Sequence, residues 1–190
     1  MFTPAKTLRD VASNAIRQIE ALGPDQRGVS SIEFALFAGL LSVGLLNTVD
    51  LSLYIYKRLE LENATQMGAQ AAWKKCDGPT KLPATINCSG LTATITSAVQ
   101  STSLGNKVTL QSGSPAEGYY CVNSSGLLQY VGAVTSSKPS DCSAAGMAAL
   151  TPSDYIRVTT VFSYAPLFPG MTVASTFTTP IVKTSMMRLD

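Results

Sequence analysis

The stretch Arg27-Gly28-Val29-Ser30-Ser31-Ile32-Glu33-Phe34 places a single carboxylate at the start of a long apolar run. The run extends from Phe34 to Tyr56, and its 23 residues would reach about 34 Å as an α-helix, enough to cross a bilayer core of about 30 Å. A cleavable secretory signal has a shorter apolar core followed by a small-x-small site, and no obvious site of that kind follows this run. The stretch therefore predicts a membrane-spanning helix.

Glu33 is the first candidate functional residue, because an acid at the edge of hydrocarbon is costly unless it has a partner. If the chain is cut after Gly28, Val29 becomes the amino terminus, Glu33 the fifth residue and Phe34 the sixth. This arrangement resembles the processing site of type IV prepilins, where a membrane aspartyl protease removes a basic leader that ends in Gly. The resemblance implies that prepilin peptidase is a partner and that Glu33 neutralises the free ammonium of a neighbouring subunit. The alternative is a plain signal anchor with Glu33 in the headgroups.

The helix is predicted to continue beyond the apolar run. From Lys57 to Trp73 there is no Pro and one Gly, and the segment is rich in Leu, Glu, Gln and Ala, which are good helix formers. One side of this segment is predicted to carry a stripe made by Leu59, Asn63, Met67 and Ala71. Before the apolar run, residues 5–22 fit either a basic amphipathic helix on the membrane face or a disordered leader.

The rest of the chain predicts a small α+β domain. Apolar residues at helical spacing indicate a helix over residues 91–99, which Gly105 would end in a left-handed conformation. Short alternating segments predict antiparallel strands at residues 107–111, 119–122, 127–131, 155–164 and 181–188. The predicted organisation is a leader over residues 1–28, a membrane-spanning and protruding helix over 29–75, and a pilin-like extracytoplasmic domain over 76–190.

Two polar residues, Asn47 and Asp50, interrupt the second half of the apolar run. Small residues that would let helix backbones approach closely precede them, namely Ala35, Ala38, Gly39, Ser42 and Gly44. These features fit a helix that packs on other helices, with Asp50 among its assembly residues. An Asp50 side chain that snorkels to the outer headgroups is an equal alternative.

Four cysteines follow the apolar run: Cys76, Cys88, Cys121 and Cys142. An even number in an exported domain predicts two disulfides, for which three pairings exist. We favour Cys76 with Cys88 and Cys121 with Cys142, because each pair encloses a loop rich in Gly, Pro or Ser. The alternative, a zinc site made by the four thiolates, lacks the short Cys-x(2 to 4)-Cys spacing, so neither a metal nor a cofactor is predicted.

Composition argues against several classes of function. The formal charge is +2 and charged residues make up 14% of the chain, so no strong field exists to gather nucleic acid, and no nucleic-acid partner is predicted. The chain has no His, which removes the usual general base of hydrolytic triads. The acids of the domain are scattered without paired spacing, so a non-enzymatic protein is predicted. An anchored enzyme with an unusual Ser or Asp site is the alternative.

The stretch from Arg27 to Trp73 resembles the TadE-like pseudopilins of tight-adherence (Tad) pilus systems. In that family an apolar helix that opens with Glu-Phe is followed by an acid and then by an Asn-Ala, Gly-Ala and Ala pattern. The matching positions here are Glu33-Phe34, Asp50, Asn63-Ala64, Gly68-Ala69 and Ala71-Ala72. Nearer the end of the chain, Tyr164 to Pro169 and Met187-Arg188 resemble the closing strand pair of the family.

This resemblance implies a minor subunit that takes part in assembly of a Tad type IV pilus and is processed after Gly28. Its implied partners are other pilin and pseudopilin subunits, the pilus assembly platform and the inner membrane. Its implied location is the bacterial inner membrane, with the carboxy-terminal domain in the periplasm or carried into an extracellular pilus. An uncleaved, membrane-anchored extracytoplasmic binding domain is the alternative function.

Overall fold

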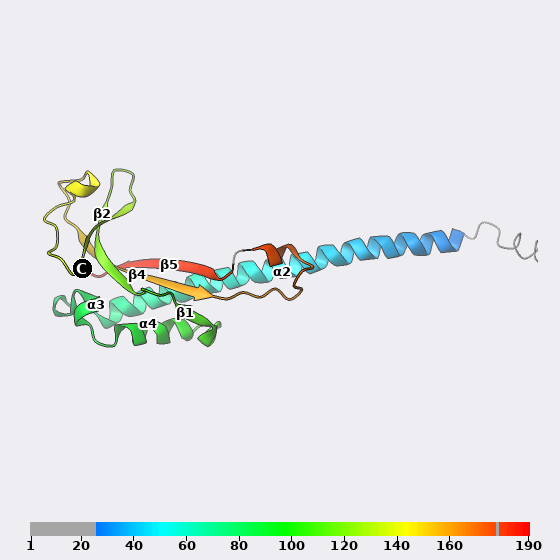
Figure 1. The fold of residues 1–190 in the computed structure, drawn as a ribbon, viewed down its shortest axis with the longest axis horizontal. Helices are drawn as coiled ribbons and strands as arrows, with labels where there is room; N and C mark the ends of the chain where they lie inside the picture. Colours follow the sequence, from blue (N-terminus) through cyan, green and yellow to red (C-terminus); the bar gives the residue numbers. More distant parts are fainter. Residues whose placement is uncertain (1–25, 178) are drawn as a thin grey trace, which may run out of the picture. The chain divides into compact units, whose positions relative to one another are not determined.

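The computed structural model describes residues 26–177 and 179–190 (Figure 1). The amphipathic leader helix predicted over residues 5–22 lies outside the described residues, as does most of the predicted leader 1–28. The chain divides into two compact units. The first ends at Leu46, and the second begins at Asn47.

Helix α2 begins at Gln26 and ends at Lys75. The sequence favours one continuous helix because no Pro occurs between these residues and Leu, Ala and other good helix formers predominate. Lys74 and Lys75 lie in the last turn, where positive charge interacts favourably with the helix dipole. All described residues of the first unit belong to this helix, and the second unit contains its remaining part from Asn47 onward.

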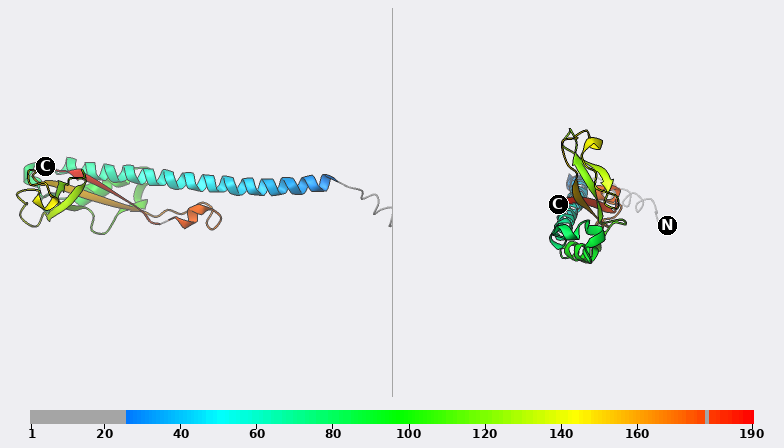
Figure 2. Two further views of the ribbon diagram at one scale, coloured as in Figure 1. Left: turned by 90° about the horizontal axis from the view of Figure 1, so that it is seen from above. Right: turned by 90° about the vertical axis from the view of Figure 1, so that its left-hand side faces the viewer.

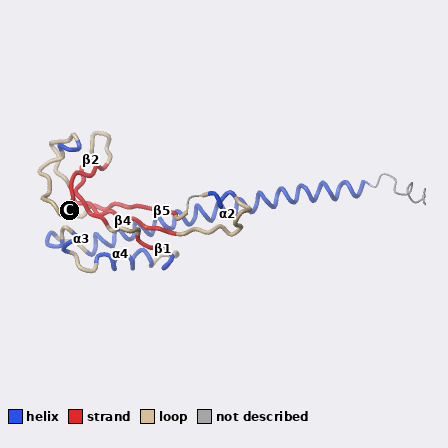
Figure 3. Tube along the Cα trace, viewed as in Figure 1, coloured by secondary structure: helices blue, strands red, loops and turns tan. Residues whose placement is uncertain are grey.

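The second unit contains a five-stranded antiparallel sheet (Figure 3). Its strands are β1 (Val108–Leu110), β2 (Ala116–Val122), β3 (Leu128–Ala133), β4 (Ser153–Phe162) and β5 (Ile181–Arg188). Strand β4 is central, because it pairs with β5 along one edge and with both β1 and β2 along the other. Strand β3 pairs only with β2, which gives the order β1-β4-β2-β3 with β5 beside β4.

Helices cover one face of this sheet. The second unit holds α3 (Ala84–Asn87) and α4 (Leu91–Gln100), and short 3-10 helices at Pro79–Lys81, Gly105–Lys107, Ser143–Ala145 and Val173–Thr176. Alternate residues of β4 are buried against α2 and α4, among them Ile156 and Val158, whereas Arg157 on the other face is exposed. The described fold is therefore α+β, with an amino-terminal apolar helix and a helix-covered antiparallel sheet, as predicted.

The buried face of α2 differs from the predicted stripe. Leu59 and Met67 are 56% and 44% exposed, so the stripe proposed from the sequence faces away from the core. The buried side consists of Leu61 and of small residues that let the helix approach the sheet closely: Ala64, Thr65, Gly68, Ala69 and Ala72. Small residue size thus contributes as much as hydrophobicity to which side of this helix packs.

Two local predictions were wrong. Helix α4 ends at Gln100, five residues before Gly105, because Ser101 and Thr102 turn their hydroxyl groups back onto the last carbonyls of the helix. Strand β4 ends at Phe162, so Tyr164 to Pro169 is a connection between strands and not part of the closing strand pair. Pro166 and Pro169 lack backbone N–H donors, which explains why this segment leaves the sheet.

The structure joins Cys76 to Cys88 and Cys121 to Cys142, the two pairs that the sequence favours. The first disulfide connects the residue after α2 to the residue after α3. The second connects β2 to the loop before β4, beside the 3-10 helix at Ser143–Ala145. Disulfides of this kind limit the conformations of the unfolded chain and stabilise a small domain.

Candidate functional site

The amino-terminal part of α2 exposes a continuous apolar surface. Over the described residues, Gly28–Lys75 is one helix whose length and apolar composition suffice to cross a membrane, and its most apolar stretch is entirely unburied. Large side chains that are 51–75% exposed follow one another along the first unit: Val29, Ile32, Phe34, Leu36, Phe37, Leu40, Leu41, Val43 and Leu45. Water is a poor solvent for such a surface, so it indicates anchoring in a membrane.

Glu33 lies on this surface and is exposed. Among the described residues, no hydrogen bond or ion pair engages its carboxylate. Val29 precedes it by four residues, and side chains four apart lie on the same side of an α-helix. Gly28 is in the first turn of α2, where backbone N–H groups have no intrahelical acceptors. The candidate processing site, Glu33 and Phe34 thus lie within the first nine residues of the helix.

Asp50 has a different environment, because its side chain is completely buried. Its carboxylate accepts hydrogen bonds from the backbone N–H groups of Leu167 at 2.9 Å and Phe168 at 3.2 Å. The hydroxyl group of Thr172 donates a third bond at 2.6 Å. These three donors come from the connection between β4 and β5. Asp50 therefore fixes a remote part of its own chain on α2, which neither sequence-based alternative includes.

Neighbouring contacts attach the same connection to one side of α2. The Tyr164 hydroxyl donates to the Asp50 carbonyl at 3.1 Å, and the Asn47 side-chain oxygen accepts from the Val173 N–H at 2.8 Å. The Tyr54 ring packs edge-on against Tyr164, with ring centroids 5.2 Å apart. It also packs in a tilted arrangement against the Phe177 ring, with centroids 4.6 Å apart. We call residues 163–177 the clamp segment. Figure 2 shows it beside α2 in a second view.

The clamp segment brings together two sequence features that lie more than a hundred residues apart. Asp50 and the segment Tyr164 to Pro169 each contributed to the family resemblance, but nothing in the sequence indicated that they touch. Two sequence features could have indicated this contact. Asp50 has no basic residue close to it in sequence, and the remote segment Tyr164 to Pro169 is rich in turn residues, whose backbone N–H groups can bind a carboxylate. The apolar run also proves to have two environments, because the helix packs against the clamp segment from Asn47 onward.

Gly68 explains how closely α2 approaches its neighbours. A Cβ atom at this position would lie 2.7 Å from a methyl carbon of Val99 and 3.3 Å from one of Ile95, both on α4. It would also lie 3.5 Å from a methyl carbon of Val158 on β4. Nearby, the Thr65 and Thr160 hydroxyl groups form a buried hydrogen bond between α2 and the sheet. The Gly-Ala pair of the family pattern is therefore a packing feature here.

Part of α2 in the second unit remains open for another partner. Leu51, Ile55 and Leu59 are 44%, 49% and 56% exposed and recur at four-residue spacing. Residues at this spacing form one side of a helix, so the second unit leaves an apolar strip uncovered on α2. Such a strip is suited to packing against another helix.

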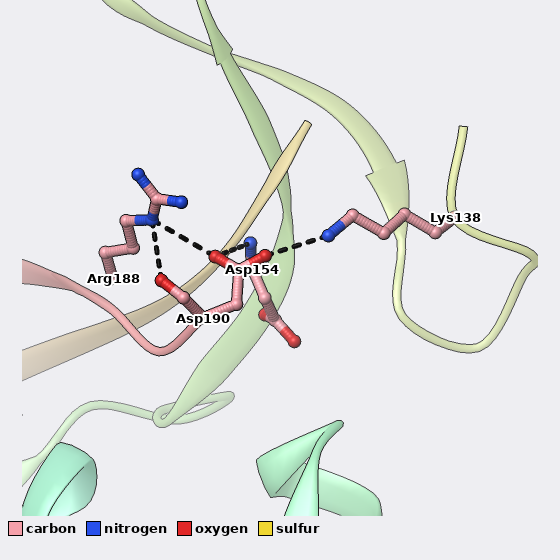
Figure 4. A network of polar contacts seen from close by, with 4 residues as sticks. All are labelled: Lys138, Asp154, Arg188 and Asp190. Carbon is pink, nitrogen blue, oxygen red and sulfur yellow. Dashed lines mark hydrogen bonds and ion pairs between the residues drawn. The ribbon is translucent and has the colours of Figure 1, made fainter. Parts of the chain in front are cut away.

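A polar cluster lies at the end of β5 (Figure 4). Asp190 forms ion pairs with Lys138 at 2.8 Å and Arg188 at 3.2 Å, and it accepts from the Asp154 N–H at 3.0 Å. Partial burial raises the pKa of Asp190, but the Lys138 and Asp154 donors outweigh this and hold the pKa below its ordinary value. Asp154 itself is 4% exposed, and one of its oxygens has no hydrogen-bond partner among the described residues.

Asp154 should make the stability of the domain depend on pH. Burial, and then the nearby Glu117 charge, raise the pKa of Asp154 to about 7, with Asp190 adding to the effect and Lys138 opposing it. The unfolded chain releases this proton near pH 4, so the free energy of unfolding should fall as the pH rises from about 4 to about 7. Asp154→Asn should flatten this dependence and stabilise the protein at pH 8 by about 1 to 3 kcal/mol.

Unfolding curves of the full chain in detergent at pH 5 and pH 8 check this prediction. Asp77→Asn, which neutralises an exposed acid at another place in the domain, is the matched control and should leave the pH dependence unchanged. An Asp154→Asn protein that loses as much stability as the parent between the two pH values would contradict it.

The fold and the apolar helix define the class of this chain: an α+β domain that follows an amino-terminal apolar helix long enough to cross a membrane. Residues 28–70 match the family model of TadE-like proteins, which confirms the predicted resemblance over that part of the chain. The match starts at the candidate processing site and includes Glu33, Asp50 and Gly68. It indicates a minor subunit associated with a Tad pilus system. Searches of curated proteins and of solved structures found no match.

Proposed function

We propose that this chain is a minor subunit of a Tad pilus system that prepilin peptidase cleaves after Gly28. The single observation that carries the proposal is the exposed Glu33 on an apolar helix within the TadE-like segment. In the proposed product, Val29 is the amino terminus, and its ammonium group supplies the positive charge that Glu33 lacks among the described residues. Opposite charges about 4 Å apart contribute on the order of 4 kcal/mol at an effective dielectric of 20.

The proposed pairing acts between subunits. The Glu33 carboxylate of one chain neutralises the ammonium of a neighbour, so that two apolar helices pack with a fixed register. Exposed Leu51, Ile55 and Leu59 provide further contact along α2, and small residues such as Gly39 allow the backbones to approach. In the same proposal, other pilin and pseudopilin subunits and the assembly platform are the partners.

The carboxy-terminal unit has a structural role in this proposal. In this proposal it lies in the periplasm, where disulfides persist, and Asp50, Gly68 and the Cys76–Cys88 disulfide hold its part of α2 against the rest of the unit. The unit therefore offers a rigid surface, in addition to α2, to another subunit whose helix packs on α2. This contact forms either in the assembly complex or at a position within the pilus. This structural role does not involve catalysis.

Intact mass and amino-terminal sequencing of the protein from its native membrane test the proposal. We expect a chain that begins at Val29. A Gly28→Pro variant should retain Met1 or another residue of the leader, because Pro changes the backbone at the bond to be cut. Gly39→Pro is not a suitable control, since it breaks the helix, whereas Gly39→Ala changes a helical Gly without contact and should be processed normally.

The same measurement distinguishes the alternative function. A native protein that still begins at Met1 would contradict prepilin-type processing and leave Glu33 without an ammonium partner. That outcome would favour an uncleaved, membrane-anchored binding domain.

A further inference from the structure

We propose that the clamp segment, residues 163–177, inserts apolar side chains into the lipid interface and forms a second membrane contact beside α2. The proposal requires that α2 is anchored in a membrane, but it requires neither processing after Gly28 nor pilus assembly. Its partner is the lipid bilayer itself, at the side where the carboxy-terminal unit lies.

The composition of the clamp segment is the first argument. From Ser163 to Pro180 the chain contains no Asp, Glu, Lys or Arg. Three large apolar side chains are nevertheless strongly exposed, since Leu167 is 60%, Met171 64% and Val173 62% accessible. Apolar side chains that stay in water contribute no burial free energy. Their transfer into the lipid interface is favourable by about 25 cal/mol per Å² of apolar area.

The attachment of the clamp segment to α2 is the second argument. Asn47 and Asp50 bind it directly, so it lies at the level of α2 where the second unit begins. The apolar helical residues before that level, 28–46, number 19 and span about 28 Å, close to a bilayer core of about 30 Å. The clamp segment therefore lies where the helix leaves hydrocarbon.

Several backbone N–H groups of the clamp segment are paired in a manner suited to an environment with little water. The Leu167 and Phe168 N–H groups bind Asp50, and the Val173 N–H binds Asn47. The Gly170 N–H donates to the Ser175 hydroxyl group at 3.0 Å, and further N–H groups bind carbonyls within the segment. Backbone groups that enter lipid must be paired in this way.

Aromatic residues at the same level support the assignment. Tyr54 and Tyr164 stack edge to face beside Asp50, and Tyr56, two residues after Tyr54, is 55% exposed. Tyr side chains gather where a membrane protein crosses the interface, because the ring is apolar and the hydroxyl group is polar. Lys57, which forms an ion pair with Glu60 at 2.7 Å, and Arg58 follow directly, and Arg58 provides a charge suited to lipid phosphates.

Fluorescence quenching in vesicles tests the proposal. The full chain carries one Trp, so Trp73→Phe provides a background in which Met171→Trp places the only indole in the clamp segment. The matched control is Leu127→Trp, at a side chain that is 65% exposed in the turn between β2 and β3. Each protein is reconstituted in phosphatidylethanolamine and phosphatidylglycerol vesicles that contain lipids brominated near the headgroup.

We expect brominated lipid to quench the indole at position 171 several-fold more strongly than the one at 127, with acrylamide showing the opposite order. Equal quenching at both positions would overturn the proposal. The indole at position 171 could instead be shielded from both quenchers, and this shielding could disappear when the protein is diluted with lipid. That result would also overturn the proposal, because it would identify a second protein copy as the occupant. If Met171→Trp alters the unfolding transition, Leu167→Trp replaces it.

Discussion

Asp50→Ala is expected to lower the free energy of unfolding by about 3 to 5 kcal/mol, because it leaves a buried group of donors without their acceptor. The N–H groups of Leu167 and Phe168 and the Thr172 hydroxyl group would all lose their partner. The clamp segment should then detach from α2 while the sheet and both disulfides persist. Chemical unfolding of the full chain in detergent measures the loss, and protease cleavage within residues 163–177 reports the detachment.

Two further variants separate the carboxylate from general disturbance of the helix. Asp50→Asn keeps one acceptor oxygen, so it should lose less stability than Asp50→Ala. Asn47→Ala removes the bond from the Val173 N–H and should cost about 1 kcal/mol. If Asp50→Ala unfolds at the same denaturant concentration as the parent and resists protease equally, the clamp segment does not depend on this residue.

Glu33→Ala is expected to reduce pilus assembly to near background while the carboxy-terminal unit stays folded. The variant removes an interaction proposed to contribute on the order of 4 kcal/mol, and each 1.4 kcal/mol corresponds to a tenfold change in association. Because Glu33 is exposed and precedes the second unit in sequence, the unfolding curve should not change. Counting pili on cells, with immunodetection of the protein in sheared filaments, measures the effect.

Conservative and distant replacements serve as controls for Glu33. Glu33→Asp retains the charge on a side chain shorter by one methylene group, so it should assemble better than Glu33→Ala. Asp77→Ala removes an exposed acid beyond the end of α2 and should leave piliation unchanged. Normal piliation in Glu33→Ala cells that contain correctly processed protein would remove the proposed role of the carboxylate.

The features predicted well from the sequence depend on local patterns. The apolar run and the helix formers after it predict α2, and alternation of Ile156, Val158 and Thr160 with more exposed residues predicts β4. The favoured cysteine pairs are also the two found in the structure, because short enclosed loops bring their ends together. Family resemblance over residues 28–70 could likewise be recognised from residue order alone.

The features that the sequence did not reveal depend on tertiary packing. The stripe of Leu59 and Met67 did not indicate which side of α2 is buried, because Gly68 and its small neighbours contact the core instead. Asp50 was placed between two alternatives that both ignored its own chain, since its donors lie more than a hundred residues away. The sequence position of Asp50 does not identify these donors. An acid within an apolar helix gives the same sequence pattern whether its carboxylate binds a neighbouring subunit or another part of its own chain.

The two attachments at either end of the packed part of α2 have a mechanical consequence. Asp50 and Asn47 hold the clamp segment at the start of this part, and the Cys76–Cys88 disulfide lies just beyond its end. A tensile load applied along the helix axis would therefore act on the contacts between them in shear, so that they must rupture together. Unzipping one contact at a time requires a free end, and this arrangement provides none. A subunit built in this way is suited to bearing force.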